Sequence, residues 1–229
     1  MKVVFFESIN NTQDYALDNF EHEPLLVISY FQEKGRGTSN KNWENADQAL
    51  ACSLVFNEVP LSFTKTLIPL IAGSSFLNTI NNMELKLKWP NDILFNDAKV
   101  GGILVEEKDD KICIGMGINY FWNNPKLPNA SALYEEKIDN EIINEHAKTW
   151  ANHTLNTIQN DLFDLAHYKK QVTTIGKLIE YPEGRGWARD VEIDGSLAVE
   201  TISGEMINLT SPLISVSYTH LTLPTTSMV

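Results

Sequence analysis

Four consecutive strand patterns between residues 85 and 121 constrain the fold of this chain most strongly. The first, LKLK at 85–88, alternates leucine with lysine, as a strand does when one face is buried and the other is wet or lines a pocket. DILF, AKVGGILVEE and KICIGMGINYF follow, joined by short polar turns at 96–97 and 109–110. Apolar runs bounded by such turns are typical of successive sheet strands.

The rest of the first three quarters of the chain predicts further strands and helices. Helices are expected at 11–20, with Asn11 as the N-cap, at 63–82, and once or twice within 139–168. In the second of these, Pro69 and Gly73 should disturb the helix interior. Additional strands are expected from the β-branched and apolar runs at 2–6, 25–31 and 49–56.

The predicted secondary structure changes near residue 173, where helical patterns give way to short strand patterns. Short strand patterns at 177–181, 186–209 and 212–218, with Asp-Gly and Ser-Gly turns, predict a small all-β meander of SH3-like barrel size. The expected fold class is α+β, a mixed sheet with packed helices followed by this barrel. We expect a catalytic domain at 1–172, a β-domain at 173–218 and a tail at 219–229. The tail is either native or a cloning or sequencing artefact.

Composition excludes several classes of protein. The formal net charge of −12 and a pI near 4.8 argue against non-specific binding of DNA or RNA. Two cysteines, Cys52 and Cys113, make neither a disulfide framework nor a CxxC metal motif, and are expected to be buried reduced thiols. The N-terminus turns polar too soon for a signal peptide, and no apolar run approaches membrane-spanning length. We therefore expect a cytoplasmic protein that binds no membrane.

The KWPND turn and the glycine pair that follows it carry the first candidate site. Pro90 should end the preceding strand, because it cannot donate to a sheet ladder. Lys86 and Lys88 share a strand face, Lys99 arrives on the next ladder, and the glycines at 101–102 remove side chains beside it. These lysines are either solvated on a hairpin or they hold an anionic ligand.

Two glycine-containing segments carry further candidates. The polar stretch at 32–47 is long for a structureless loop and carries GRG, Lys34, Lys41 and Trp43, so it could close over a polyanion and stack on a purine. The alternative is a solvated loop. In GMGIN, the two glycines leave room for a flat ligand, and Asn119 could read an adenine edge. The alternative there is a structural bulge.

In order and spacing, NTQDYA, Q..GRG.....W, KWPNDI, KVGGILVE and GMGIN resemble the biotin–protein ligase (holocarboxylase synthetase) family. The resemblance runs from about residue 3 to residue 218. It implies synthesis of biotinyl-5′-adenylate from biotin and ATP, with Mg²⁺ accompanying ATP and pyrophosphate released. The biotinyl group would then pass to one lysine of a biotin carboxyl carrier domain. The family fold, a mixed sheet with helices followed by an SH3-like barrel, agrees with the pattern above.

The resemblance also implies roles for individual residues, with Lys99 and Arg36 as the catalytic pair and no metal ligands. The residues implied in biotin binding are Asn11, Thr12, Gln13, Gln32, Gly35, Arg36, Lys99, Gly101, Gly102, Gly115 and Gly117. Those implied in ATP binding are Arg36, Trp43, Lys88, Asn91, Lys99 and Asn119.

The chain departs from the family motif at two places. The Ser-Thr-Asn segment of the family falls on residues 11–13, where only Thr12 is identical. The loop usually has a further arginine and a glycine where this chain has residues 38–40, leaving Lys41 as a partial substitute.

Rival interpretations follow from the same residues. A lipoate or octanoate ligase or transferase shares the catalytic fold, although KWPND and the GRG loop favour biotin. A non-catalytic module that binds biotin or the adenylate is the second alternative. The chain begins directly at the expected catalytic strand, so we expect no DNA binding. The resemblance also allows a homodimer, because members of the family often self-associate.

Overall fold

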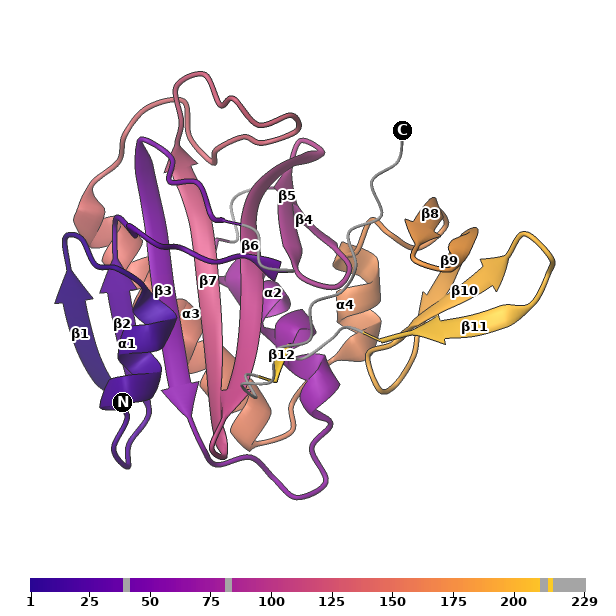
Figure 1. Ribbon diagram of the computed structural model, residues 1–229, viewed down its shortest axis with the longest axis horizontal. Coiled ribbons are helices and arrows are strands. Elements are labelled where there is room, and N and C mark those ends of the chain that lie inside the picture. The colour runs from indigo at the N-terminus through magenta and orange to yellow at the C-terminus, as the bar shows by residue number, and fades with distance from the viewer. Residues whose placement is uncertain (39–41, 81–83, 211–213, 216–229) are drawn as a thin grey trace, which may run out of the picture.

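The computed structural model describes residues 1–38, 42–80, 84–210 and 214–215. Most of them form one large mixed sheet with helices on its two faces, beside a small second sheet (Figure 1). The strands of the large sheet are β1 (Lys2–Phe6), β2 (Leu25–Ser29), β3 (Gln48–Phe56), β4 (Leu85–Lys88), β5 (Asp92–Phe95), β6 (Ala98–Lys108) and β7 (Lys111–Phe121). They lie in the order β1-β2-β3-β7-β6-β5-β4, and only β1 and β2 pair in parallel within that order.

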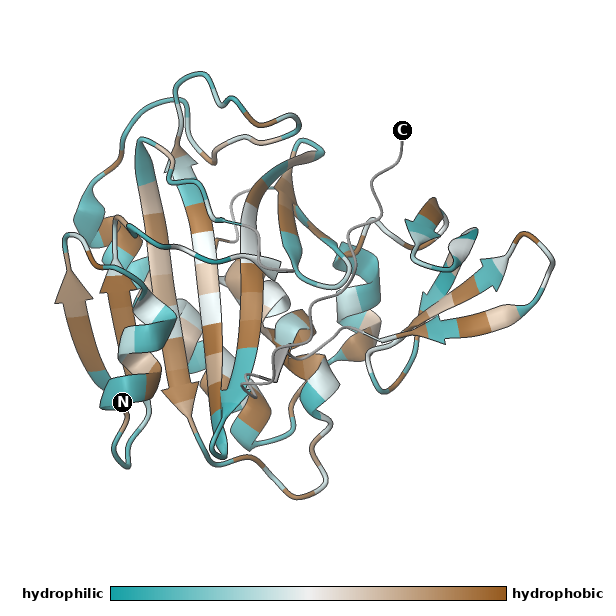
Figure 2. Ribbon diagram, in the orientation of Figure 1, coloured by the Kyte–Doolittle hydropathy of each residue, from teal (hydrophilic) through white to brown (hydrophobic). Residues whose placement is uncertain are grey.

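The helices divide between the two faces of this sheet. They are α1 (Thr12–Asn19), α2 (Ile68–Thr79), α3 (Asn140–Gln159) and α4 (Leu165–Gln171), with a 3-10 turn, η2 (Lys65–Leu67), before α2. In β2, Leu25 and Val27 pack with α1, whereas Leu26 and Ile28 belong to the core that contains α2 and α3. Alternate residues of a strand point to opposite faces, so both faces of β2 are buried. Figure 2 shows hydrophobic residues along the strands and hydrophilic ones in the loops.

The local signals of the sequence explain where these elements begin and turn. The Asn11 side chain accepts hydrogen bonds from the backbone N–H groups of Gln13 and Asp14, at 2.8 and 3.0 Å, so the expected N-cap is confirmed. β4 buries its leucines and exposes its lysines, as the alternation predicted. The turns at 96–97 and 109–110 have φ between 49° and 63°, a region that Asn and Asp tolerate.

Three expectations need correction or refinement. α2 begins at Ile68, so Pro69 lies in the first turn, where its missing N–H costs nothing, and does not disturb the helix interior. The pattern at 139–168 forms two helices, because Asp164 starts α4 as a new N-cap. The strand expected at 212–218 is described only as β12 (Ile214–Ser215), which pairs with β6 of the large sheet and not with the small sheet. The tail at 219–229 lies outside the described residues.

The small sheet is an antiparallel meander of β8 (Leu178–Tyr181), β9 (Gly184–Val191), β10 (Leu197–Thr201) and β11 (Met206–Leu209). Gly195 and Gly204 take φ values of 82° and 84° at its tight turns, as expected. Trp89 joins this sheet to the large one, since its Nε1 donates to the Gly195 carbonyl at 3.0 Å. The meander is confirmed, while closure into an SH3-like barrel and the boundary near 172 remain predictions.

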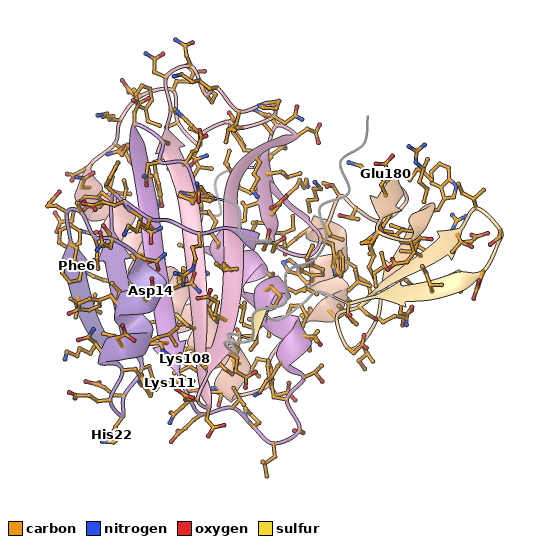
Figure 3. The ribbon with its side chains drawn as sticks, in the orientation of Figure 1. Phe6, Asp14, His22, Lys108, Lys111 and Glu180 are labelled. Atoms are coloured by element: carbon orange, nitrogen blue, oxygen red, sulfur yellow. The ribbon has the colours of Figure 1, made fainter. Side chains whose placement is uncertain are left out.

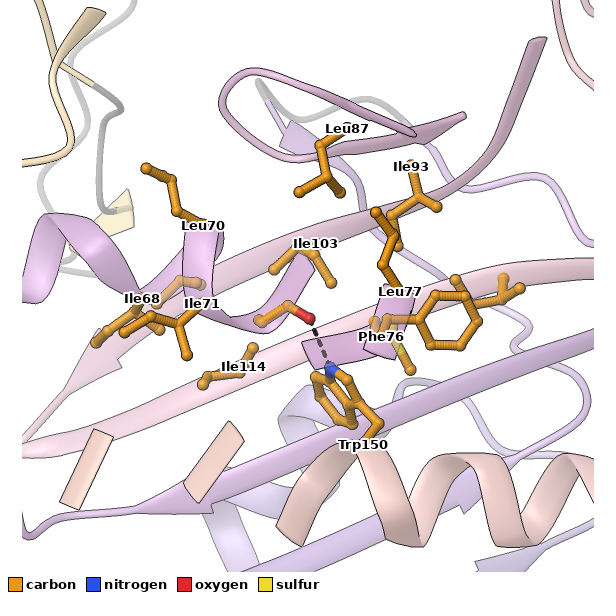
Figure 4. Packing of buried hydrophobic residues seen from close by; sticks show 14 of the residues in the cluster. Ile68, Leu70, Ile71, Phe76, Leu77, Leu87, Ile93, Ile103, Ile114 and Trp150 are labelled. Atoms are coloured by element: carbon orange, nitrogen blue, oxygen red, sulfur yellow. Dashed lines mark hydrogen bonds between the residues drawn. The ribbon is translucent and has the colours of Figure 1, made fainter. Parts of the chain in front are cut away.

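The core between the large sheet and its back helices contains the largest fully buried side chain, Trp150 of α3. Its Nε1 donates to the Ala72 carbonyl of α2 at 2.9 Å, and Phe76, Ile103 and Ile114 lie in the same cluster (Figure 4). One side chain thus connects both back helices with the sheet. No helix in the ranges described above has the length and apolar character needed to cross a membrane.

We expect Trp150→Ala to lower the free energy of unfolding by about 3–5 kcal/mol, because it empties a closely packed site and removes the hydrogen bond that the indole donates to the Ala72 carbonyl. Urea unfolding followed by circular dichroism measures this. Trp187, which is 44% exposed, supplies the matched control, and Trp187→Ala should cost much less. Equal losses in the two variants would contradict this account of the core.

Candidate functional site

A trough crosses the front face of the large sheet beside α1. Its floor forms because the register sets Gly102 of β6 opposite Gly117 of β7, and Gly115 opposite Leu104, so side chains are missing at three neighbouring positions. The cavity left between the side chains is small, about 50 Å³. The predicted site residues that line it are Thr12, Gln13, Gln32, Arg36, Trp43, Asn91, Lys99, Gly102, Gly115 and Gly117.

One end of the trough is cationic and carries a carboxylate between two lysines. Lys99 Nζ lies 2.5 Å from Asp92 Oδ1, and Lys88 Nζ lies 3.8 Å from Asp92 Oδ2. The hairpin register places Asp92 between Lys88 and Gly102, so all three share the trough face. The sequence interpretation treated Asp92 only as a turn residue. Its position across the tight turn from Lys88 was the signal that could have identified it.

The other end is a buried polar cluster at the start of α1. The backbone N–H and hydroxyl of Thr12 both donate to Gln32 Oε1, at 2.8 and 3.0 Å, and Ser53 Oγ donates to the Thr12 hydroxyl at 2.8 Å. Ser53, on β3, was missed because it sits inside an apolar run. Asn11 does not line the trough, since it caps α1 and donates to the Lys34 carbonyl at 2.8 Å.

Arg36 lies at this polar end and is held by two carboxylates. Its guanidinium donates to Asp14 at 2.8 Å and to the buried Glu106 at 3.0 Å; Figure 3 labels Asp14 on α1, in front of the sheet. The hydrogen bond to Asp14, together with the charge of Glu106, raises the pKa of Arg36 above its ordinary value, so the cation persists despite partial burial. Glu106 follows Gly102 by four residues on β6, or about 13 Å. Arg36 and Lys99 both line the cavity, Arg36 at its polar end and Lys99 at its cationic end.

Trp43 occupies the middle of the trough. A Cβ atom on Gly117 would lie only 2.6 Å from Trp43 Cζ2, so the indole rests directly on the glycine floor. Its backbone N–H donates to the Gly35 carbonyl at 2.9 Å, so Gly35 lies beside the tryptophan in the loop and does not line the cavity. Among the described residues, none accepts a hydrogen bond from the buried Trp43 Nε1.

Two further residues implied in ligand binding support the trough. Asn91 lines its wall, and Gly101 packs behind its floor. The Asn91 side chain donates to the Ile103 carbonyl at 2.9 Å, fastening the KWPND turn to β6. Gly101 faces away from the cavity, because a Cβ there would lie 2.5 Å from Ile118 Cδ1 and 2.8 Å from the Gly117 carbonyl oxygen. Gly101 is thus a packing requirement of the sheet.

Asn119 is buried next to the trough, and only one of the two polar atoms of its side chain has a hydrogen-bond partner among the described residues. Its Nδ2 donates to the Ser131 carbonyl at 3.0 Å, while Oδ1 has no partner in the described part of the chain. The segment around Ser131 also pairs with Lys99, whose N–H donates to the Asn129 carbonyl at 2.7 Å. This segment was missed, because nothing in its composition marks it as part of a site.

The remaining predicted features are the loop residues that differ from the family motif, the absence of metal ligands and the two cysteines. Thr38 lines the trough, whereas residues 39–41, including the predicted substitute Lys41, lie outside the described residues. No group of three or more His, Cys, Asp or Glu side chains in the described ranges could hold a metal ion. Burial raises the pKa of the Cys52 and Cys113 thiols, so neither is a reactive thiolate at neutral pH.

Two relatives illustrate the similarity to known proteins. The bifunctional ligase/repressor BirA of Bacillus spizizenii is 29% identical over 164 residues, which cover 63% of this chain and 50% of that protein. The biotin--[acetyl-CoA-carboxylase] ligase of Mycobacterium tuberculosis is 26% identical over 208 residues, covering 81% of this chain and 76% of that protein. The chain thus spans about half the length of the first relative.

Structural similarity extends over nearly the whole chain. The biotin protein ligase from Aquifex aeolicus, solved in complex with biotin and ATP, has a TM-score of 0.75 at 23% identity, covering 92% of this chain and 96% of that one. The expected mixed sheet with packed helices and a small β-sheet unit is therefore confirmed as the fold. A model of the biotin/lipoate A/B protein ligases matches residues 5–119, half of the chain. The chain belongs to the biotin/lipoate A/B protein ligase family.

Proposed function

We propose that the protein ligates biotin to a specific lysine of a biotin carboxyl carrier domain in two steps, through biotinyl-5′-adenylate made from biotin and ATP. The observation that carries the proposal is the trough itself. A glycine floor connects a cationic end at Lys99 with a buried polar end at Thr12 and Gln32. Family membership and the ligase names of the relatives support the same reaction.

Biotin has two chemically different ends that suit this arrangement. Its ureido head group needs hydrogen-bond partners in an otherwise apolar slot, which Thr12, Gln32 and Ser53 can supply. Its carboxylate needs a cation, and Lys99 lines the opposite end. Once Trp43 has left the glycine floor, the floor would give room for the ring system and the alkyl chain between them.

The first step joins the carboxylate to the α-phosphate of ATP. A carboxylate oxygen attacks the α-phosphorus, the bond to the bridging oxygen breaks, and pyrophosphate leaves. Both reactants are anionic, so catalysis consists mainly of positioning and cationic stabilisation. Lys99 would hold the carboxylate against the phosphate, and Lys88 lies beside it on the same face. Mg²⁺ is proposed to arrive with ATP and to neutralise phosphate charge.

The second step transfers the biotinyl group. The acceptor lysine, as a free amine, attacks the acyl carbon of the mixed anhydride, the bond to the phosphate oxygen breaks, and AMP leaves. Exclusion of water would protect the anhydride until the acceptor arrives. Arg36, Thr38 and Trp43 line the trough, and the loop that carries them would provide that cover.

The loop must rearrange before the trough can fill, because Trp43 rests on the glycine floor. An unsatisfied buried N–H costs about 1–3 kcal/mol, and the indole N–H of Trp43 finds no acceptor among the residues that the structure describes. Moving the indole outward would relieve this cost and offer its face to the adenine. Asn119 Oδ1, which has no partner in the described part of the chain, could then accept from the adenine amino group.

The proposal is limited to ligation in the cytoplasm, with the carrier domain as the macromolecular partner. A net charge of −12 gives no basis for binding a polyanionic duplex. We also propose that the chain divides into domains at 1–172 and 173–218, and that it can assemble as a homodimer.

ATP–pyrophosphate exchange tests the adenylating half-reaction, with biotin, lipoate, octanoate or no acid added to the purified protein. We expect exchange that depends on biotin. Exchange with lipoate or octanoate instead would assign the chain to the other branch of its family. Absence of exchange with every acid, in protein shown to be folded, would favour a non-catalytic module that binds biotin or its adenylate.

Lys99→Ala should lower biotin-dependent exchange by at least about 100-fold, because it removes the cation that joins carboxylate and phosphate. Lys170→Ala, an exposed lysine on α4, is the matched control and should leave the rate unchanged. Circular dichroism of both variants checks that the fold is retained. A Lys99→Ala variant with full turnover would remove Lys99 from the mechanism.

Trp43→Ala should weaken the binding of a non-hydrolysable ATP analogue by roughly tenfold, because base stacking on an aromatic ring is worth about 1–3 kcal/mol. Biotin binding should change less, since the indole leaves the glycine floor when the trough fills. Isothermal titration of each ligand separately measures both effects, and Trp43→Phe should retain most of the nucleotide affinity. Equal losses for biotin and nucleotide would rule out adenine stacking.

A further inference from the structure

Gln13 lies next to Thr12 at the polar end of the trough, and its side chain lines the cavity. Gln13 is 5% exposed, and its backbone N–H donates to Asn11 Oδ1 at 2.8 Å in the cap of α1. A Cβ atom on Gly115 would lie 2.6 Å from Gln13 Oε1 and 2.8 Å from its Cδ. The carboxamide therefore lies directly on the floor, in space that any other residue at position 115 would need.

The cationic end is set by Lys99. Its Nζ lies 3.5 Å from the Cβ position of Gly102, which is opposite Gly117 in the sheet. Gly117 and Gly115 are two residues apart on β7, or about 7 Å. The sheet and the capped start of α1 thus hold the Lys99 ammonium and the Gln13 carboxamide at a set separation along the trough.

The geometry points to Gln13 as the residue that determines how long an acid the trough accepts. This inference rests on the proposed function, in which Lys99 holds the carboxylate of biotin and the head group lies at the polar end. With the carboxylate held, each additional methylene in the alkyl chain pushes the head group onto the Gln13 carboxamide. Gln13 is a steric stop, and it selects among acids by their length.

A substitution of matched size tests this directly. Gln13→Asn withdraws the carboxamide by one methylene and keeps its donor and acceptor, and asparagine is the residue that the family motif carries here. The measurement is the dissociation constant, without ATP, of biotin and of a biotin analogue with one more methylene in its chain. Wild type should prefer biotin about tenfold or more, and Gln13→Asn should shift the ratio toward the longer acid by about tenfold.

Gln159→Asn is the matched control, because Gln159 is exposed at the end of α3, and it should leave the ratio of the two dissociation constants unchanged. If wild type binds biotin but Gln13→Asn leaves the ratio unchanged, the assignment is overturned. If wild type binds neither acid, the proposed function fails and the assignment fails with it.

The contact itself can be tested without any ligand. Gly115→Ala should lower the melting temperature, because its methyl group would overlap the Gln13 carboxamide. Combining it with Gln13→Ala removes four side-chain atoms and should restore most of the loss. A double variant no more stable than Gly115→Ala alone would overturn the contact on which the inference is built, whatever the binding data show.

Discussion

The antiparallel pairing of β6 with β7 is the constraint on which the rest of the site depends. It places Gly102 opposite Gly117 and carries Gly115 two residues further along the same face. A shift of one residue would turn every one of these positions to the opposite face. The floor would then lie under α2 and α3, in the hydrophobic core. The tight turn between the two strands, whose residues both adopt positive φ, holds this register.

Charge is distributed unevenly over this floor, and each end has its own counterions. Asp92 lies between two lysines at one end, and Arg36 lies between two carboxylates at the other. Removing one member of a buried pair is costly, because the remaining charge is left without a partner. The Arg36 contact with the buried Glu106 therefore anchors the start of the loop. The indole N–H of Trp43, further along the loop, has no acceptor within the described ranges of the chain.

Most of the fold could be predicted from local patterns. Alternation in β4, the polar turns and the Asn11 cap each act over a few residues, so the sequence displays them directly. The parallel pairing of β12 with β6 was not predictable, because it joins segments about a hundred residues apart.

The site was predicted less completely, for a physical reason. Glycines and lysines with unusual surroundings stood out, and ten of the residues named from the sequence line one cavity. Ser53, Asp92 and Glu106 did not, since each occupies an ordinary strand or turn position and gains its role only from a neighbour on another strand. Asn11 and Gly101, also assigned to the ligand, lie in the helix cap and in the sheet packing and do not line the cavity.

Trp89 has a consequence for how the two sheets depend on each other. It is the residue between Lys88 and Pro90, and its indole N–H donates to the Gly195 carbonyl in the turn between β9 and β10. The turn that presents Lys88 and Asp92 is thus supported on its outer side by a part of the chain more than a hundred residues away. Loosening, cutting or replacing the small sheet would remove this support, and the Trp89 indole would carry the disturbance to the cationic end of the trough.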